Sequence, residues 1–308
     1  MDILPVKKLE PGDTIGLFSS SSPTSERSVN NIKKYFESKG YKIKTSSHLF
    51  ASNGYMAGTA KERADDLNEL VNDNDVKIIM TANGGKSGLQ MLPFIDYEAV
   101  RKHSKGIIGL SDPAVLLNAV TAKSGIISLH GPNGYNFGEN SLSEYSEKNW
   151  WDFVTGKQNN IYLGEEAYVL RGKGDITGTL FGGHLGTVSN LLGTEWEPEW
   201  RASILFLEEA FTNYSSIDAM LNHLRYCGVF DKINGLIFGK LEQCGESNYE
   251  ISESLQDIIL RNCDGYDFPI VTDAWIGHTE NKVTLPIGGS AELSLNDCCL
   301  NIIDKVVI

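Results

Sequence analysis

The first 130 residues alternate between two patterns of hydrophobic residues. Short apolar runs that end in small or polar residues are typical of buried strands, and they lie at residues 14–20, 41–47, 76–85, 105–111 and 125–132. Apolar residues spaced three to four positions apart predict amphipathic helices at residues 25–40 and 59–73. Strands separated by helices favour a mostly parallel sheet with helices on both faces.

The pattern changes after residue 133. Residues 134–160 are polar, with one aromatic helix around Trp150 and Trp151, and we interpret them as a connector. Short strands with turn residues follow between residues 167 and 304, interrupted by a helix at 216–230. The chain therefore predicts an α/β fold with a parallel-sheet domain at residues 1–160, connector included, and a smaller β-rich α+β domain at residues 161–308.

Composition and charge exclude several classes of protein. Apolar residues make up 41% of the 308 positions and charged residues 22%, as in globular proteins. The net charge of −13 argues against nucleic acid as a partner, because binding its backbone depends on Lys and Arg. We expect no membrane span, because no run reaches about 18 apolar residues, and no signal peptide, because no basic segment precedes an apolar core. Five irregularly spaced cysteines indicate neither a disulfide framework nor a zinc site, and favour the reducing cytoplasm.

Ser111 stands at the corner between a predicted strand and a predicted helix. With Pro113 in the first turn, Ser111 is interpreted as an ordinary helix cap. The alternative is a nucleophile, which needs a base, an acid that orients the base, and backbone N–H groups that hold an oxyanion. The helix start offers the N–H of Asp112. Paired glycines allow close backbone approach, so Gly85 can offer a second N–H.

The base and the acid are sought in the second half of the chain. Of the six histidines, His278 is the strongest candidate because it ends an apolar strand and precedes a polar loop, whereas His130 and His184 are weaker candidates. Two acids, Glu208 and Glu209, close another apolar strand, and the residues alone do not decide between them. An acid and a base from the second domain would place the site between the two domains.

Several segments resemble the LD-carboxypeptidases, a family of serine peptidases. The similar segments are IGLSDPAVLLNAV (108–120), YMAGTAKERADDLNELVNDNDVKIIMTANGG (55–85), MLPFIDY (91–97), HGP (130–132), GTLFGGHLGTVSNLLGTEWEP (178–198) and ILFLEEAF (204–211), in order over nearly the whole chain. The resemblance implies a Rossmann-like N-terminal domain, a smaller β-rich C-terminal domain, a homodimer, a cytoplasmic location, and activity without a metal or other cofactor.

The family's functional residues fall on matching positions of this chain. The resemblance assigns the catalytic serine to Ser111, the glutamate to Glu208 and the histidine to His278. It assigns the oxyanion donors to the backbone of Gly85 and Asp112.

Two departures from the family pattern bear on the substrate. Asn83 stands where murein-cleaving members often carry an arginine, and His184 stands where an asparagine usually follows two glycines. The connector and the GTEWEPEW loop look more like the branch that contains the microcin C immunity peptidases, which cleave an amide between an amino acid and a modified nucleotide. Trp196 in that loop is either a stacking surface for a base or plain packing. Asn83, Gly84, His184 and Trp196 are therefore the expected substrate-binding residues.

The leading hypothesis is a serine amidase that acts through an acyl-enzyme on a small peptidyl- or aminoacyl-nucleotide. One alternative is a carboxypeptidase that removes the terminal D-alanine from a murein tetrapeptide. A second is an α/β-hydrolase, which has the same order of Ser, acid and His, although the second glycine of its G-x-S-x-G motif is missing here. A third is a non-catalytic protein that binds a small ligand between its domains.

Overall fold

The computed structural model describes residues 2–157, 160–245 and 253–308, and its first half is built on a six-stranded sheet. In spatial order the strands are β12 (Leu285–Ile287), β5 (Ser128–His130), β4 (Gly106–Gly109), β3 (Val76–Thr81), β1 (Thr14–Phe18) and β2 (Lys42–Thr45). All neighbours are parallel except β12 and β5. The carboxyl ends of the parallel strands therefore meet at one edge.

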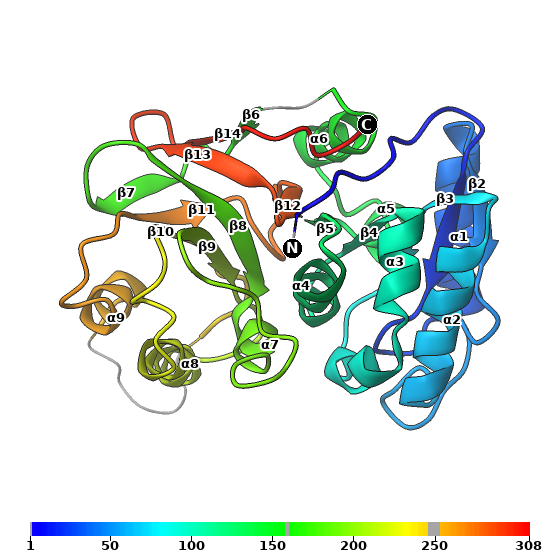
Figure 1. Cartoon of the computed structure of the whole chain (residues 1–308), viewed down its shortest axis with the longest axis horizontal. Coiled ribbons are helices and arrows are strands. Elements are labelled where there is room, and N and C mark those ends of the chain that lie inside the picture. Colours follow the sequence, from blue (N-terminus) through cyan, green and yellow to red (C-terminus); the bar gives the residue numbers. More distant parts are fainter. Residues whose placement is uncertain (1, 158–159, 246–252) are drawn as a thin grey trace.

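Helices cover this sheet (Figure 1). They are α1 (Glu26–Ser38), α2 (Ala60–Asn72), the 3₁₀ helix η1 (Gly88–Phe94), α3 (Tyr97–His103), α4 (Pro113–Ser124), α5 (Gly134–Gly138) and α6 (Glu144–Val154). N-cap residues determine where α1 and α2, the two helices predicted from periodicity, begin. Ser25 accepts a hydrogen bond from the N–H of Ser28, and Thr59 forms a capping box with Glu62. Nearly every residue of α4 is buried, so this helix lies in the core rather than on the surface.

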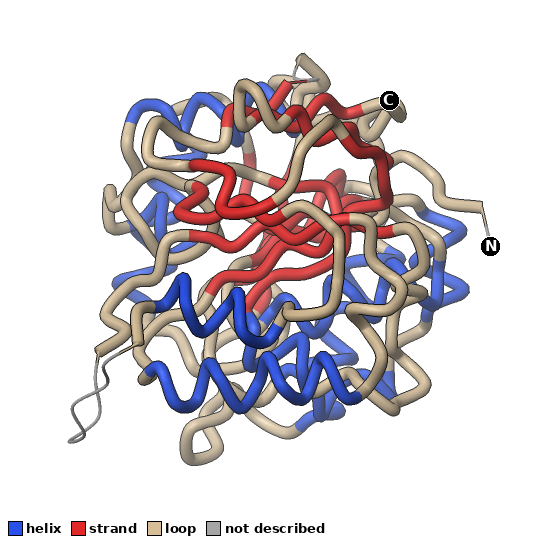
Figure 2. The backbone as a smooth tube through the Cα atoms, turned by 90° about the vertical axis from the view of Figure 1, so that its left-hand side faces the viewer, coloured by secondary structure: helices blue, strands red, loops and turns tan. Residues whose placement is uncertain are grey.

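The second half forms an eight-stranded sheet. Its order is β6 (Asn160–Tyr162), β14 (Cys299–Ile302), β13 (Ser290–Ser294), β8 (Ile176–His184), β9 (Ser203–Glu208), β10 (Gly235–Gly239), β11 (Ile270–Ala274) and β7 (Tyr168–Arg171). The central strands β8 to β11 are parallel and the outer pairs are antiparallel. Its helices in the described part of the chain are α7 (Leu185–Ser189), α8 (Tyr214–Tyr226) and α9 (Leu255–Asn262). Strands lie in the middle of the molecule with helices around them (Figure 2), which confirms the predicted α/β class.

Strand β12 joins the two halves of the chain. The sequence predicts that residues 161–308 form the second domain, but residues 285–287 of that range pair with a strand of the first sheet. Leu285 pairs with His130 of β5, so the chain returns to the first sheet after His278. The cause is the turn at Gly288, whose φ of +90° breaks the run into two strands that enter different sheets.

The predicted connector contributes to the hydrophobic core, although most of its residues are polar. Trp150 of α6 is fully buried and packs on Phe36 of α1 and Phe137 of α5. Helix α6 is therefore part of the core of the first half. Residues 158 and 159 of the predicted connector lie outside the described residues.

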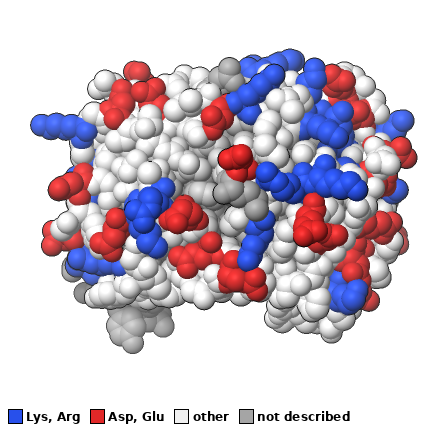
Figure 3. Space-filling model, viewed as in Figure 1, with Lys and Arg blue, Asp and Glu red and all other residues white. Residues whose placement is uncertain are grey.

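The surface carries charges of both signs. On the face seen in Figure 3, acidic and basic side chains are interspersed. Among the helices of the described chain, none has the length and apolar character needed to cross a bilayer.

Candidate active site

Ser111 sits in a strained turn between β4 and α4. Its φ is +73°, in the left-handed region that L-residues seldom adopt and that costs about 1–3 kcal/mol when imposed. Helix α4 begins at Pro113 with Asp112 as its N-cap residue, and the Ser111 hydroxyl has no hydrogen-bond partner in the part of the chain that the structure describes. The interpretation of Ser111 as a cap is therefore wrong. Strain of this kind clusters at functional sites.

The Asp112 carboxylate fixes the glycine loop beside Ser111. Its Oδ2 accepts hydrogen bonds from the N–H groups of Ser87 and Gly88, at 3.0 and 2.7 Å. A Cβ at Gly84 would lie 3.1 Å from Ser111 Oγ, so the loop passes directly over the hydroxyl. Within the described residues, the N–H groups of Gly85 and Asp112 have no acceptor. Both residues line the same cavity as Ser111. Asp112 also stands at the start of α4, where the helix dipole favours negative charge.

Glu208 and His278 form a hydrogen-bonded pair in which the carboxylate is fully buried and the imidazole is partly exposed. The Oε2 atom of Glu208, the last residue of β9, lies 2.8 Å from Nδ1 of His278, which follows β11. Burial raises the pKa of the Glu208 carboxyl, but the charge and hydrogen bond of His278 outweigh it and lower the pKa to about 2. A Cβ at Gly277 would overlap Glu208 Oε2, and the φ of Gly277 is +104°. Only glycine therefore fits beside this pair.

The next residue, Glu209, pairs with a different histidine. Its Oε1 lies 2.9 Å from Nε2 of His184, and its Oε2 accepts the N–H of Gly186 at 3.0 Å. Burial lowers the pKa of His184, but the hydrogen bond that its ring donates to Glu209 and the charge of Glu208 outweigh it, so the pKa is raised. The rings of His184 and His278 lie 5.8 Å apart. Adjacent residues of a strand point to opposite faces, which sends the two carboxylates to different imidazoles.

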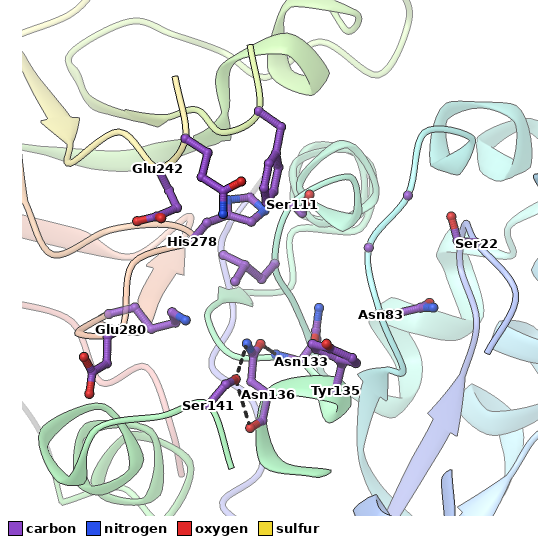
Figure 4. Close-up of a pocket in the computed structure, with 16 residues that line it drawn as sticks. Ser22, Asn83, Ser111, Asn133, Tyr135, Asn136, Ser141, Glu242, His278 and Glu280 are labelled. Carbon is purple, nitrogen blue, oxygen red and sulfur yellow. Dashed lines mark hydrogen bonds between the residues drawn. The ribbon is translucent and has the colours of Figure 1, made fainter. Parts of the chain in front are cut away.

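Two cavities meet at Ser111 and His278. The larger, of about 800 Å³, is also lined by Tyr135 and Lys282, and the smaller, of about 520 Å³, by His184 and Glu209. Figure 4 shows Ser111 and His278 together at one end of the larger cavity. No hydrogen bond joins Ser111 Oγ to the His278 ring, and Nε2 of His278 is unpaired within the described residues. Catalytic hydrogen bonds are often long before substrate binds.

Three of the four predicted substrate-binding residues line one of the two cavities, and the fourth lines neither. Asn83 and Gly84 line the larger cavity, although the Asn83 amide donates to the carbonyl of Pro23 at 2.9 Å. His184 lines the smaller cavity. Trp196 lines neither and packs against the hydrophobic core. Of the two interpretations of Trp196, packing is therefore the one that agrees with its position.

His130, one of the two weaker candidates for the base, lines neither cavity. It is fully buried against Phe206, with ring centroids 5.3 Å apart, and burial lowers its pKa to about 4. Both ring nitrogens, like Oε1 of Glu208, are buried without a partner among the described residues.

Sequence reasoning missed several residues of the site. Tyr135 lies just beyond the end of β5, an edge where ligand-binding residues are expected. Phe211 lines both cavities and contacts His278 with ring centroids 5.8 Å apart. Lys282 gave no signal, because a lysine in a polar loop is usually exposed. Over the described part of the chain, no group of three or more His, Cys, Asp or Glu side chains is placed to hold a metal ion.

Both halves of the chain match domain models of one protein family. Residues 15–131 match the LD-carboxypeptidase N-terminal domain, and residues 177–293 match the LD-carboxypeptidase C-terminal domain. The microcin C7 self-immunity protein MccF of Escherichia coli is 31% identical over 96% of this chain and 95% of its own. The probable murein peptide carboxypeptidase of Bacillus subtilis is 28% identical over 94% of this chain and 91% of its own.

A solved structure has the same fold over the whole chain. MccF in complex with aspartyl sulfamoyl adenosine superimposes with a TM-score of 0.90 at 28% identity, over 99% of this chain and 100% of that one. The two family matches and the identity to MccF, which extend over nearly the full length, identify this chain as a member of the LD-carboxypeptidase family of serine peptidases.

Proposed function

We propose that the protein hydrolyses an amide bond through an acyl-enzyme, with Ser111 as nucleophile, His278 as base and Glu208 as the acid that orients His278. The observation that carries this proposal is the 2.8 Å hydrogen bond between Glu208 and His278 at the cavity that contains the Ser111 hydroxyl. The left-handed backbone of Ser111 supports it, because it holds a side chain that caps nothing.

The charge of Glu208 determines which nitrogen of His278 is the base. A carboxylate with a pKa of about 2 is ionised at neutral pH and only accepts hydrogen bonds. Nδ1 of His278 therefore carries the proton, which leaves the lone pair on Nε2. In the reaction, Nε2 takes the proton of Ser111 Oγ while that oxygen forms a bond to the substrate carbonyl carbon.

The acyl-enzyme then forms and is hydrolysed. The C–N bond breaks as His278 gives its proton to the leaving nitrogen. Water next attacks the ester carbonyl carbon and gives a proton to His278. The ester C–O bond then breaks as His278 returns that proton to Ser111 Oγ. The N–H groups of Gly85 and Asp112 hold the negative oxygen in both steps, and one such donor contributes about 2.7–4 kcal/mol in a comparable hydrolase.

The two cavities suit a substrate with two unlike halves. The larger cavity is lined by the half-exposed ring of Tyr135 and by the side chains of Asn133 and Asn136, groups that suit stacking and hydrogen bonding of a nucleoside. The smaller cavity, lined by His184 and Thr212, suits an aminoacyl side chain. The MccF structure that holds aspartyl sulfamoyl adenosine supports this substrate class. We therefore propose an aminoacyl-nucleotide of the microcin C type as the substrate.

A murein peptide is the second candidate, because the B. subtilis relative is named for it. Wild-type protein and the Ser111→Ala variant are incubated with aspartyl sulfamoyl adenosine and with a murein tetrapeptide, and cleavage is followed by mass spectrometry. We expect the wild type to cleave the nucleotide faster and the variant to cleave neither. Faster loss of D-alanine from the tetrapeptide favours the second candidate, and equal turnover by wild type and variant rejects the proposed mechanism.

The homodimer and the cytoplasmic location implied by the resemblance stay predictions.

A further inference from the structure

Lys282 is a buried lysine at the larger cavity. It lies four residues after His278 and lines the cavity together with Ser111 and His278. Only 3% of the residue is exposed. Lysines are almost never buried to this extent unless they are paired.

The backbone around Lys282 is fixed by α6. Its N–H donates to Ser146 Oγ at 2.7 Å, and the N–H of Thr284 donates to Asn149 Oδ1 at 2.8 Å. The hydroxyl of Ser146 in turn donates to the carbonyl of Glu280. The position of Lys282 is thus determined by buried side chains of the first half of the chain, so the segment does not carry the lysine to the surface.

The ammonium group of Lys282 has no partner. Within the described residues it forms neither a hydrogen bond nor an ion pair, so no carboxylate lies within 4.0 Å of it. Burial lowers the pKa of Lys282 to about 8, although the carboxylates of Glu208, Glu242 and Glu280 oppose the shift. The group therefore remains mostly charged at neutral pH. The charge therefore meets the cavity and not a protein partner, and an anionic ligand in the cavity supplies one.

The walls of the cavity offer donors and two carboxylates. Asn133, Asn136 and Ser141 are uncharged and form one group, as Figure 4 shows. Glu280 is exposed, so solvent screens its charge, and Figure 4 shows its carboxylate away from this group. Glu242 also lines the cavity, and Figure 4 shows its carboxylate away from this group, toward the His278 side. The uncharged group and Lys282 together provide hydrogen-bond donors for an anion.

We propose that Lys282 binds an anionic group in the leaving half of the substrate, either a phosphate-type linker or a terminal carboxylate. This inference rests on the proposed function, since it assigns the leaving half to the larger cavity. It adds a specificity-determining residue to the proposed site: amides whose leaving half carries a negative charge next to the scissile bond are preferred over neutral ones.

Binding measurements test this inference without turnover. Isothermal titration calorimetry compares AMP with adenosine, and N-acetyl-D-alanine with its amide, on wild type and on Lys282→Met and Lys282→Arg. We expect the wild type to bind the anionic member of one pair more tightly by about 10- to 100-fold. Lys282→Met should lose that preference, and Lys282→Arg should keep most of it. A preference in the first pair identifies a phosphate-type group, and one in the second identifies a carboxylate.

The control variant is Lys61→Met, which removes an exposed charge on α2 that pairs with Asp65. It should bind like the wild type, and thermal unfolding verifies that each variant folds. The inference is overturned if the wild type shows no preference in either pair, or if Lys282→Met keeps the preference. Failure of the proposed function is a separate outcome, because it is read from the turnover of the wild type and Ser111→Ala.

Discussion

Oε2 of Glu208 and Nδ1 of His278 lie 2.8 Å apart, although 70 residues separate them in the chain. The contact requires β9 and β11 to run parallel on either side of β10, so that both carboxyl ends reach the same edge. It also requires Gly277, because any side chain there would occupy the place of the carboxylate. The proposed roles of Glu208 and His278 depend on this geometry.

Replacing each glutamate separately tests which one serves His278. Glu208→Gln should lower kcat by about 10³- to 10⁴-fold, because the amide no longer stabilises the imidazolium or fixes its tautomer. Glu209→Gln is the matched control, since it makes the same change one residue away, at a carboxylate that contacts His184 and Gly186 instead of His278. Its kcat should fall by less than about tenfold, with a larger effect on the choice of acyl side chain. Steady-state kinetics that show the reverse order would contradict the assignment.

Substituting Gly277 should lower kcat far more than the accompanying loss of stability explains. Gly277→Ala places a methyl group on Glu208 Oε2, so kcat should fall by more than about 100-fold. The control is Gly12→Ala, whose φ of +93° is comparable but whose Cβ would meet no atom within 4 Å. Both variants should lose about 1–3 kcal/mol of stability through backbone strain. If both retain wild-type kcat, the close approach at Gly277 has no catalytic role.

The buried His130 should make stability depend on pH. Its folded pKa of about 4 lies below the ordinary value of 6.5, so between these pH values the unfolded chain binds the proton and the folded protein does not. The free energy of unfolding should therefore fall as pH drops from about 6.5 to about 4, by up to about 3 kcal/mol from this residue. Below pH 4 the contribution of His130 no longer changes.

Urea unfolding of wild type and His130→Leu at several pH values measures this difference. The variant should lose less stability than the wild type over the same range, whatever its stability at pH 7. The other titrating groups are common to both proteins, so their effects cancel in the comparison. Identical pH dependence in the two proteins would show that His130 is not held neutral.

Tyr135 should bind the nucleobase of the substrate by stacking on it. Tyr135→Ala should raise KM for aspartyl sulfamoyl adenosine by about 5- to 100-fold, since stacking on an aromatic ring contributes about 1–3 kcal/mol per base. Tyr135→Phe should stay close to the wild type because it keeps the ring. Trp196→Ala, outside both cavities, should change KM less than about twofold if the protein remains folded. A large effect at Trp196 with none at Tyr135 would restore the stacking role expected from the sequence.

Much of the fold followed from local patterns. The strands of the first sheet, the capped helices α1 and α2, and most strands of the second sheet were predicted because their periodicity and end residues agree. Strand β12 was misassigned because pairing between residues 130 and 285 has no local signal. Helix α4 was recognised from its apolar run, but only the structure shows that Asp112 rather than Ser111 is its N-cap.

The sequence identified some residues of the candidate site correctly, left others undecided and missed others. The structure pairs His278 with Glu208 and not with Glu209, a choice that depends on strand geometry and on Gly277 rather than on residue type. Trp196 was selected for its chemistry, yet its position is determined by packing after α7. Lys282 was missed because burial, not composition, distinguishes it from a surface lysine.

The most direct test of the central claim is active-site labelling with a fluorophosphonate, followed by peptide mapping by mass spectrometry. The account predicts one label on the native wild type, located on Ser111, with none on Ser111→Ala and greatly reduced labelling of Glu208→Gln. Labelling at another serine, or cleavage of substrate by Ser111→Ala at the wild-type rate, would contradict it.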